Sequence, residues 1–270
     1  MPFVNNIDIT SNLRQSIELE TWRLLDLEYD DPFMNMAVEE AIPRMVGQRV
    51  APFTLRFWRN QNAVAVGNFQ SVNLEVNHNA CKKYGTQIVR RFTGGGSVYH
   101  DHGNLNYAIS IPKEHRLVPP SDPMDAFRRF SEGALQSLKS LGLLPVLKSL
   151  NNLEVNRKKV CGAAGAIRWG AVFYHSSILV CSNLNILSHV LRSDDYTTTR
   201  FIKSSRRPVT TVSKELNRSL TTNEFSDTLV RCFGRIYGVQ LFHGTLMENE
   251  KRLADELYEK YSSHKWNFKT

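Results

Sequence analysis

The sequence contains no apolar run that approaches the roughly 20 residues a helix needs to span a bilayer. Residues 1–14 also lack the basic start and apolar stretch of a secretory signal peptide, and they are poor in the arginines of a transit peptide. Hydrophobic residues still make up 41% of the chain, which is enough for a sizeable buried core. We therefore expect a globular, cytoplasmic protein without a membrane partner.

Cysteine is scarce. The chain has four, at Cys81, Cys161, Cys181 and Cys232. No two of them form a CxxC pair, which argues against a zinc or redox motif and favours free, mostly buried thiols. His100 and His102 flank Asp101, but no third ligand accompanies them, so no metal site is predicted.

Two common catalytic motifs are missing as well. No Gly-Lys-Ser/Thr follows the glycine cluster at residues 94–96, so the chain has no Walker phosphate loop. The sequence also lacks Gly-x-Ser-x-Gly, which argues against a serine hydrolase of that type.

Positive charge, by contrast, is in excess. The formal net charge is +8 and the pI is about 9.4, so an anionic partner is expected. Nucleic acid, a nucleotide or an acidic protein surface would each meet that description, and charge alone leaves the three open.

The pattern of apolar residues predicts many short strands and a few helices. The expected strands are residues 22–27, 54–58, 63–66, 88–91, 98–99, 105–111, 153–155, 159–161, 172–174 and 178–180. Because most strands follow one another directly, we expect an α+β fold with a mixed or antiparallel sheet and helices packed on it. No repeat or linker divides the chain, so one catalytic domain over residues 1–270 is expected, with a short N-terminal extension at 1–20.

Helix boundaries are marked by capping residues. Asp31 followed by Pro32 predicts the start of a helix, which Pro43 should kink or end. A helix over residues 74–84 should stop at glycine 85, and a second long helix should begin near residue 121. Capping boxes at Thr221 and Thr245 predict two late helices.

The most informative stretch runs from Arg90 to Asp101 and reads RRFTGGGSVYHD. Glycines let the backbone approach a ligand closely, and successive N–H groups can surround a phosphate. The paired arginines add positive charge and bidentate donors. With both features together, we interpret the stretch as a site for an acyl phosphate or a nucleotide phosphate.

Two later stretches are less specific on their own. Residues 157–166 read RKKVCGAAGA, in which Lys159 could neutralise a carboxylate and a phosphate as they react. Taken alone, this segment fits a basic hairpin turn better than a site. Likewise, His175 in an apolar strand is most simply a buried histidine with satisfied hydrogen bonds.

Together and in this order, the three stretches resemble lipoate–protein ligases. The signature of that family is Arg-Arg, two variable residues, Gly-Gly-Gly, a small residue, Val, an aromatic, His-Asp and Gly-Asn, and it stands here at residues 90–104. Lys159 lies in a matching Lys-x-x-Gly-x-Ala pattern, and His175 matches the family's histidine before a leucine-rich strand. The similarity extends from Trp22 to Phe268.

The resemblance implies a fold like that of biotin protein ligases and class II aminoacyl-tRNA synthetases. It implies that ATP, with Mg²⁺, activates lipoate to lipoyl-adenylate, which is then attacked by a lysine of a carrier domain. The expected carriers are lipoyl domains of 2-oxoacid dehydrogenase complexes or the glycine cleavage H protein, with no nucleic acid involved. Lys159 is the expected catalytic residue, bridging the acyl carbonyl and the α-phosphate. The expected substrate-binding residues are Arg90, Arg91, Gly94, Gly95, Gly96, Ser97, Val98, Tyr99, His100, Gly162, Ala164 and His175.

Two departures from the family bear on adenylation. Asn152 occupies a position where ligases commonly have an acidic residue, which would help to hold Mg²⁺. The accessory C-terminal domain of larger family members is absent from this sequence, which ends where it would begin. We therefore expect a separate accessory subunit to be needed for adenylation.

The main alternative is a lipoyl or octanoyl transferase that starts from preformed acyl-adenylate or from an acyl-carrier thioester. Thioester transfer uses a cysteine nucleophile, and residues 147–152, where we would expect it, contain none. Cys161 is interpreted as a small buried residue. A noncatalytic nucleic-acid-binding module rests on charge alone, and biotin stays open as a substrate because the sequence does not reveal the pocket walls.

Overall fold

The computed structural model of the protein describes residues 19–192, 204 and 207–269. The N-terminal extension expected at residues 1–20 therefore lies outside the described residues as far as residue 18. None of the helices in the described part of the chain is both long enough and apolar enough to cross a membrane.

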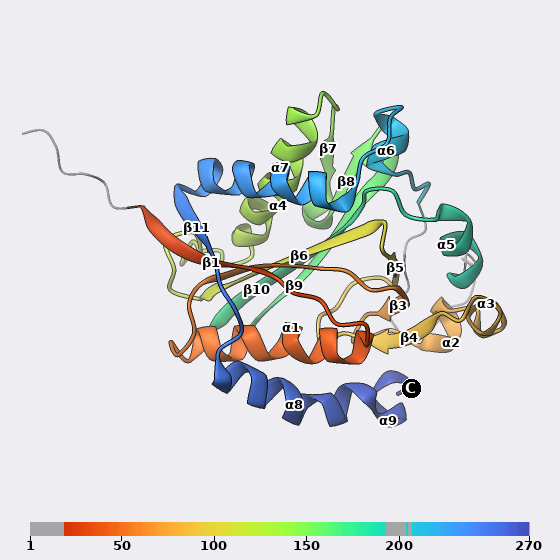
Figure 1. Ribbon diagram of the computed structural model, residues 1–270, viewed down its shortest axis with the longest axis horizontal. Helices are drawn as coiled ribbons and strands as arrows, with labels where there is room; N and C mark the ends of the chain where they lie inside the picture. The colour runs from red at the N-terminus through yellow and green to blue at the C-terminus, as the bar shows by residue number, and fades with distance from the viewer. Residues whose placement is uncertain (1–18, 193–203, 205–206, 270) are drawn as a thin grey trace, which may run out of the picture.

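A large mixed sheet forms the centre of the molecule (Figure 1). Its described strands are β1 (Glu20–Asp26), β2 (Thr54–Trp58), β6 (Asn104–Pro112), β7 (Val146–Lys148), β8 (Asn152–Val155), β9 (Lys158–Arg168), β10 (Ala171–Leu179) and β11 (Val239–His243). The spatial order is β11-β1-β2-β6-β10-β9-β8-β7. β11, β1 and β2 run parallel, whereas the pairings from β2 to β7 are antiparallel. The expected mixed sheet is confirmed.

A smaller sheet lies beside the large one. It consists of β4 (Gln87–Arg90), β3 (Asn62–Val66) and β5 (Val98–Asp101), with β3 in the middle. One face of it packs against short helices, and the other turns towards the large sheet through Ala65 and Val98. The glycine cluster connects β4 to β5 at one edge of this sheet.

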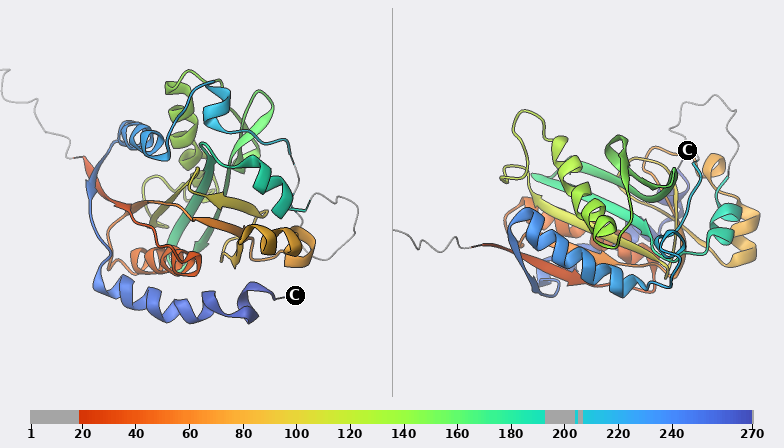
Figure 2. Two further views of the ribbon diagram at one scale, coloured as in Figure 1. Left: turned by 45° about the vertical axis from the view of Figure 1, so that its right-hand side comes forward. Right: turned by 90° about the horizontal axis from the view of Figure 1, so that it is seen from above.

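Helices pack on the large sheet, as predicted, and they cover both of its faces. The described α-helices are α1 (Pro32–Gly47), α2 (Val72–Glu75), α3 (His78–Tyr84), α4 (Asp125–Ser140), α5 (Leu184–Val190), α6 (Val212–Glu215), α7 (Thr222–Tyr237), α8 (Glu248–Ser262) and α9 (His264–Asn267). α4 and α7 lie on one face, and α1 lies on the other with α8 packed outside it (Figures 1 and 2). A short 3-10 turn (Ser149–Asn151) joins β7 to β8.

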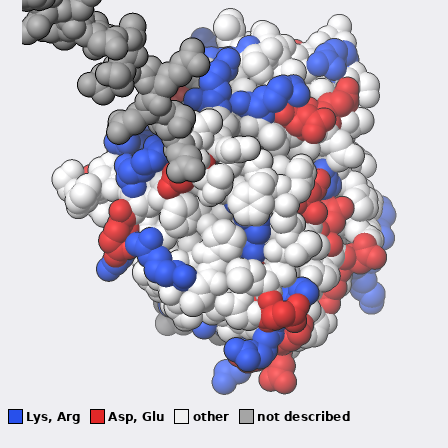
Figure 3. All heavy atoms as spheres, turned by 60° about the vertical axis from the view of Figure 1, so that its left-hand side comes forward, with Lys and Arg blue, Asp and Glu red and all other residues white. Residues whose placement is uncertain are grey.

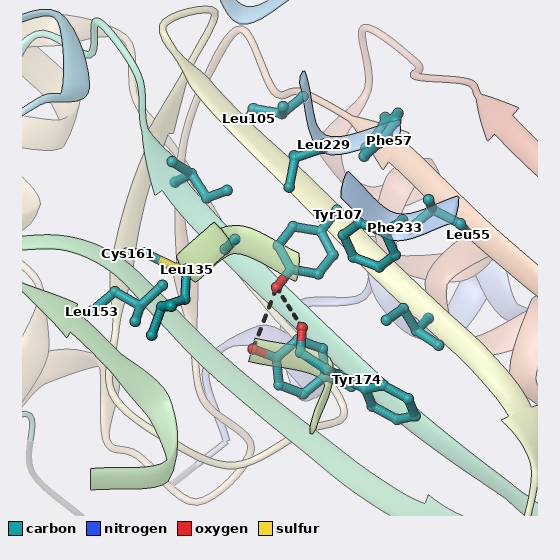
Figure 4. Packing of buried hydrophobic residues seen from close by; sticks show 14 of the residues in the cluster. Leu55, Phe57, Leu105, Tyr107, Leu135, Leu153, Cys161, Tyr174, Leu229 and Phe233 are labelled. Atoms are coloured by element: carbon teal, nitrogen blue, oxygen red, sulfur yellow. Dashed lines mark hydrogen bonds between the residues drawn. The ribbon is translucent and has the colours of Figure 1, made fainter. Parts of the chain in front are cut away.

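The largest apolar cluster fills the space between the sheet and α4 and α7. Tyr107 and Tyr174, from adjacent strands β6 and β10, meet Phe233 of α7 there, and Tyr107 donates a hydrogen bond to the carbonyl of Phe130 (Figure 4). At roughly 25 cal/mol per Å² of apolar surface removed from water, such a cluster is the main source of stability. We call this side of the sheet the core face.

Most predicted helix ends are found, and three expectations need correction. Asp31 caps α1 by accepting from the N–H of Phe33 (2.8 Å). The helix does not end at Pro43 but continues to Gly47, while a kink at Pro43 stays a prediction. An interior proline costs about 3 kcal/mol. In α1 that cost is outweighed by burial, because the helix is enclosed between the sheet and α8.

The predicted helix at residues 74–84 is two helices. Val76 is extended, and Asn77 caps α3 by accepting from the N–H of Ala80 (3.1 Å), because an asparagine side chain replaces the missing backbone acceptor.

The last expected capping box is displaced. The Thr221–Glu224 box is present at α7, but α8 begins at Glu248 and not at Thr245. The Thr245 carbonyl instead accepts a hydrogen bond from the guanidinium of buried Arg23 (3.0 Å). The carboxylate of Glu250 accepts from the backbone N–H of Met247 (2.8 Å).

Candidate active site

A cavity of about 660 Å³ lies between the small sheet and the face of the large sheet opposite the core face. We call that side the site face. Its floor includes a row of neighbours on five adjacent strands, Trp58, Asn106, Ser177, Gly162 and Asn152. Because strands lie about 4.8 Å apart, the row extends over roughly 19 Å. The cavity is therefore elongated across the strands.

The glycine cluster forms part of the cavity wall. Gly95 has φ +85°, a conformation that favours glycine. Its carbonyl oxygen lies so close to Gly67 that a Cβ there would approach it to 2.1 Å. Gln70 accepts from the N–H of Gly67 (2.9 Å) and the hydroxyl of Ser97 (2.8 Å), and it ties the loop to the end of β3. The loop is thus held in one shape before any ligand binds.

Arg91 supports the same loop from inside. Its guanidinium donates to the carbonyls of Gly94 (2.7 Å), Gly96 (2.8 Å) and Ala65 (2.9 Å). Burial lowers its pKa to about 10, so it still carries its charge at neutral pH. Arg91 lines the cavity and places a fixed cation beside it.

Arg90 points to a different part of the molecule. Its guanidinium donates to the carbonyls of Gly67 (2.8 Å), Gln70 (2.7 Å) and Asn267 (3.0 Å), and burial lowers its pKa to about 10. Neither Arg90 nor Gly94 is among the described residues that line the cavity. The structure thus places Arg90 between the glycine cluster and the C-terminal segment, and its expected contact with substrate stays a prediction.

Lys159 lies on the β8–β9 hairpin, whose turn residues Asn156 and Arg157 have φ values of 49° and 63°. The backbone N–H of Lys159 donates a hydrogen bond to the carbonyl of Pro208 in the neighbouring segment (2.8 Å). Its side chain passes over Gly162, where a Cβ would come within 2.7 Å of Nζ. The glycine of the Lys-x-x-Gly-x-Ala pattern therefore makes room for the lysine, and Ala164 follows on the same face of β9.

Cys161 faces the other way. It is a neighbour of Leu153 and Ile178 on the core face, is only 3% exposed, and lies beside Leu135 and Leu153 in Figure 4. Burial raises the pKa of its thiol to about 11, and Sγ lies 2.9 Å from the hydroxyl of Ser176. A thiol in this environment is not ionised at neutral pH.

His175 is held on both ring nitrogens. Nε2 lies 2.8 Å from the hydroxyl of Thr93, and Nδ1 lies 3.1 Å from the carboxylate of Glu39. Burial lowers the pKa of His175, and Glu39 opposes the shift in part. The Thr93 oxygen already accepts a hydrogen bond from Arg91 (3.1 Å), so the Thr93 hydroxyl donates its proton to Nε2 of His175. The ring proton of His175 is therefore on Nδ1, from which it is donated to Glu39. Through Thr93, His175 is coupled to the glycine cluster.

The remaining predicted residues also border the cavity. Gly96, Ser97, Val98, Tyr99 and His100 all line it. The Ser97 N–H does not point into open space, because it donates to the hydroxyl of Ser204 (2.8 Å). The cavity thus has Lys159 and Arg207 towards one end and Trp58 and His100 towards the other, with Arg91 also among its lining residues.

Two further observations concern possible metal ligands and the surface charge. In the described part of the chain, no group of three or more His, Cys, Asp or Glu residues is placed to hold a metal ion. On the face shown in Figure 3, groups of Lys and Arg lie interspersed with groups of Asp and Glu.

An elongated cavity with a rigid glycine cluster and one lysine at its polar end suits an acyl chain joined to a phosphate. The model for the lipoyl protein ligase A/B catalytic domain matches residues 31–234. The chain belongs to this family. The whole constellation from Arg91 to His175 lies within the matched part.

Relatives of this ligase-family chain fall into two kinds. It is 36% identical to "Lipoate-protein ligase A subunit 1" of Thermoplasma acidophilum over 87% of this chain and 91% of the relative. It is also 32% identical to "Octanoyltransferase LipM" of Symbiobacterium thermophilum, over 92% of this chain and 98% of that relative. A T. acidophilum lipoate protein ligase structure with bound lipoic acid superposes with a TM-score of 0.79, at 31% identity over 93% of this chain and all of the other.

Several supporting residues of this lipoyl ligase family site were not predicted. They are Glu39, Asn60, Thr93, Ser204 and Arg207. Glu39 had a detectable signal, since it is an acid among the apolar residues of a helix that had to be buried. Ser204 and Arg207 follow no periodic pattern, and only the folded chain brings them to the cavity.

Proposed function

We propose that the chain is the catalytic subunit of a lipoate–protein ligase that works in the cytoplasm. The lipoate carboxylate attacks the α-phosphate of ATP, pyrophosphate leaves, and lipoyl-adenylate forms. The ε-amine of a carrier-domain lysine then attacks the acyl carbon, AMP leaves, and the amine loses a proton. Lys159 stabilises the charge on the acyl oxygen and phosphate in both steps, and Arg91 adds a second fixed cation.

One observation carries the choice of a ligase over a thioester-forming transferase. All four cysteines lie in the described part of the chain, and Cys161 is the one that borders the cavity. Its thiol is packed in the core face and its pKa is raised to about 11, so it is poorly suited to act as a nucleophile. A reaction through acyl-adenylate needs no such group.

Asn152 would offer an oxygen to the metal that accompanies ATP. Asn152 lines the cavity, and its Oδ1 is buried with no hydrogen-bond partner among the described residues. Its Nδ2 donates to Asn151 (3.0 Å), which orients Oδ1 away from that residue. An amide oxygen is an acceptable ligand for Mg²⁺ but lacks the charge of a carboxylate. This supports the need for an accessory subunit in the adenylation step.

The expected partners are an accessory subunit and a lipoyl-accepting domain. A T. acidophilum structure that superposes with a TM-score of 0.79 at 33% identity is described as a bi-partite lipoate protein ligase with its E2 lipoyl domain. We propose the same division of labour here, with the net charge of +8 favouring an acidic carrier domain.

The test gives the purified chain three acyl donors in parallel, each with a lipoyl-accepting domain. The donors are lipoate with Mg-ATP, synthetic lipoyl-adenylate, and octanoyl-acyl-carrier protein. We expect modification from lipoyl-adenylate by the chain alone, and from lipoate with Mg-ATP only after the accessory subunit is added. Lys159→Ala is the matched inactive control. Efficient turnover of lipoate and ATP by the chain alone would disprove the requirement for a second subunit.

The second candidate is an octanoyltransferase, which the 32% identity to LipM favours. It predicts transfer from octanoyl-acyl-carrier protein without ATP and a thioester on a cysteine. Mass spectrometry of the chain after incubation with that donor decides the matter, because a thioester on Cys161 would displace the ligase proposal.

A further inference from the structure

The Trp58 end of the cavity contains two hydrogen-bond donors without acceptors. The indole Nε1 of Trp58 and the imidazole Nε2 of His100 are both buried, and neither has a partner among the described residues. Their rings lie 5.5 Å apart at 77°, and both residues line the cavity. The other lining residues at this end include the apolar Met36, Ala65 and Val98, together with Asn106 beside Trp58.

A chain of amides determines which nitrogen of His100 carries the proton. The Tyr29 N–H (3.0 Å) and the Arg56 guanidinium (3.0 Å) both donate to Oδ1 of Asn35. Asn35 therefore uses Nδ2 to donate to Oδ1 of Asn60 (2.9 Å), and Asn60 uses Nδ2 to donate to Nδ1 of His100 (3.2 Å). Because Nδ1 accepts, the ring proton is on Nε2.

His100 also stays neutral. Burial lowers its pKa to about 3, with Arg91 and His175 adding to the shift. His100 is 3% exposed, so its ring is enclosed by protein and does not lie at the outer surface. Leaving a buried donor without an acceptor is costly, so a ligand that supplies an acceptor at this point is favoured over one that does not.

The two acyl groups relevant to the proposed function differ at this point. An octanoyl chain ends in a methyl group, which accepts no hydrogen bond. A lipoyl chain ends in a dithiolane ring, whose sulfur atoms are weak acceptors and also pack well against aromatic rings. Nζ of Lys159 lies over Gly162, which is three strand spacings, or roughly 14 Å, from Trp58 along the floor row. An acyl chain whose carboxylate end is held near Lys159 therefore extends towards the Trp58 end.

We propose that His100, fixed by Asn35 and Asn60, selects the sulfur-bearing lipoyl group over the octanoyl group by donating Nε2–H to a dithiolane sulfur. The inference rests on the proposed function, since it assumes that acyl groups enter this cavity. It assigns His100 the role of a specificity-determining residue, and Trp58 contributes a second donor and an aromatic wall.

The test compares kcat/KM for transfer from lipoyl-adenylate and from octanoyl-adenylate to a lipoyl-accepting domain. We expect the unmodified chain to prefer the lipoyl donor about tenfold. His100→Met should bring the ratio close to one, whereas His100→Gln, of the same length but with a donor, should keep most of the preference. His102→Met is the control, because His102 is exposed two residues away and outside the cavity lining.

Direct binding separates this inference from the proposed function. Calorimetry with free lipoate and free octanoate measures the same preference without turnover, and nitrogen-15 NMR of the unmodified chain follows Nε2–H of His100. A shift of that signal with lipoate but not with octanoate supports the inference even if no adenylate is turned over, in which case the proposed function alone fails. Equal affinity for the two acids, or a preference that survives His100→Met, would overturn the inference.

Discussion

The two faces of the large sheet are made by the same strands but from different chemistry. On the core face, Tyr107 and Tyr174 pack with Phe233 in a continuous apolar cluster. On the site face, Arg56 and Glu39 form a buried ion pair (3.3 Å), and an open cavity replaces close packing. Because successive residues of a strand point to opposite sides, one strand supplies both stability and chemistry.

Strand β9 shows the division most clearly. Cys161 and Gly165 belong to the core face, while Gly162 and Ala164 belong to the site face. Neighbouring positions should therefore fail in different ways when they are changed. Substitutions on the core face should cost stability, and substitutions on the site face should cost catalysis.

The largest effect is expected at Lys159, whose side chain lies on the site face. Lys159→Ala should lower the rate of transfer from lipoyl-adenylate by about 10³-fold, because it removes the cation that stabilises the reacting acyl oxygen and phosphate. The fold should persist, which circular dichroism would show alongside the kinetic assay. Activity within a few-fold of the unmodified chain would exclude a catalytic role.

The two glycines of β9 give a matched pair across the sheet. Gly162→Ala places a Cβ 2.7 Å from Nζ of Lys159, and should lower kcat about 10²-fold by displacing the lysine. Gly165→Ala instead places a Cβ 2.5 Å from the ring of Phe127.

For Gly165→Ala, overpacking should cost about 1–3 kcal/mol in the free energy of unfolding while the residual folded protein stays active. Urea unfolding and steady-state kinetics on both variants would check the pair. If both variants lost the same property, the two faces would not be independent.

Residues on the two faces should also differ in how they change the pH dependence of the free energy of unfolding. His100 has a folded-state pKa near 3, against about 6.5 when unfolded, so only the unfolded chain gains its proton as pH falls below 6.5. Its contribution to stability is full above pH 6.5 and declines by about 1.4 kcal/mol per pH unit towards pH 3.

Between pH 7 and pH 5 the free energy of unfolding should therefore fall by about 2 kcal/mol less in His100→Gln than in the unmodified chain. Tyr174→Phe, a change on the core face, should leave the pH dependence unaltered. The same slope in His100→Gln and in the unmodified chain would show that His100 titrates normally.

The smallest effect is expected at Cys161. Cys161→Ser should keep transfer from lipoyl-adenylate within a few-fold, because the thiol is buried on the core face and takes no part in the reaction. The hydroxyl should cost about 1–3 kcal/mol of stability through burial of a polar group. Loss of transfer in a folded Cys161→Ser protein would contradict the separation of the faces.

The sequence was sufficient wherever a local rule decides the structure. The strand pattern, the Asp31 cap, the Asn156–Arg157 turn and the Thr221 box all depend on residues a few positions apart. The order of the Arg91, Lys159 and His175 motifs was likewise readable, and the structure places all three around one cavity.

Other features required the fold. Arg90 looks equivalent to Arg91 in the sequence, yet its partners are mainly backbone carbonyls, some of them about 177 positions away, which no side-chain pattern marks. The end of α1 was misplaced because the burial that outweighs Pro43 comes from α8, far along the chain. Which face of β9 holds the cavity was also undecidable, since small residues occupy both.

The Arg90 contacts have a practical consequence for protein production. Arg90 donates to the carbonyls of Asn267 and Lys269, and the Lys269 ammonium donates to Asn68 (2.6 Å). Asn68 is next to Gly67, which lies against the carbonyl of Gly95 in the glycine cluster. A chain extension that starts soon after Lys269 would therefore begin close to the residues that shape the glycine cluster. Kinetic work on this chain should use a removable tag at the C-terminus, or none at all, so that measured constants reflect the native loop.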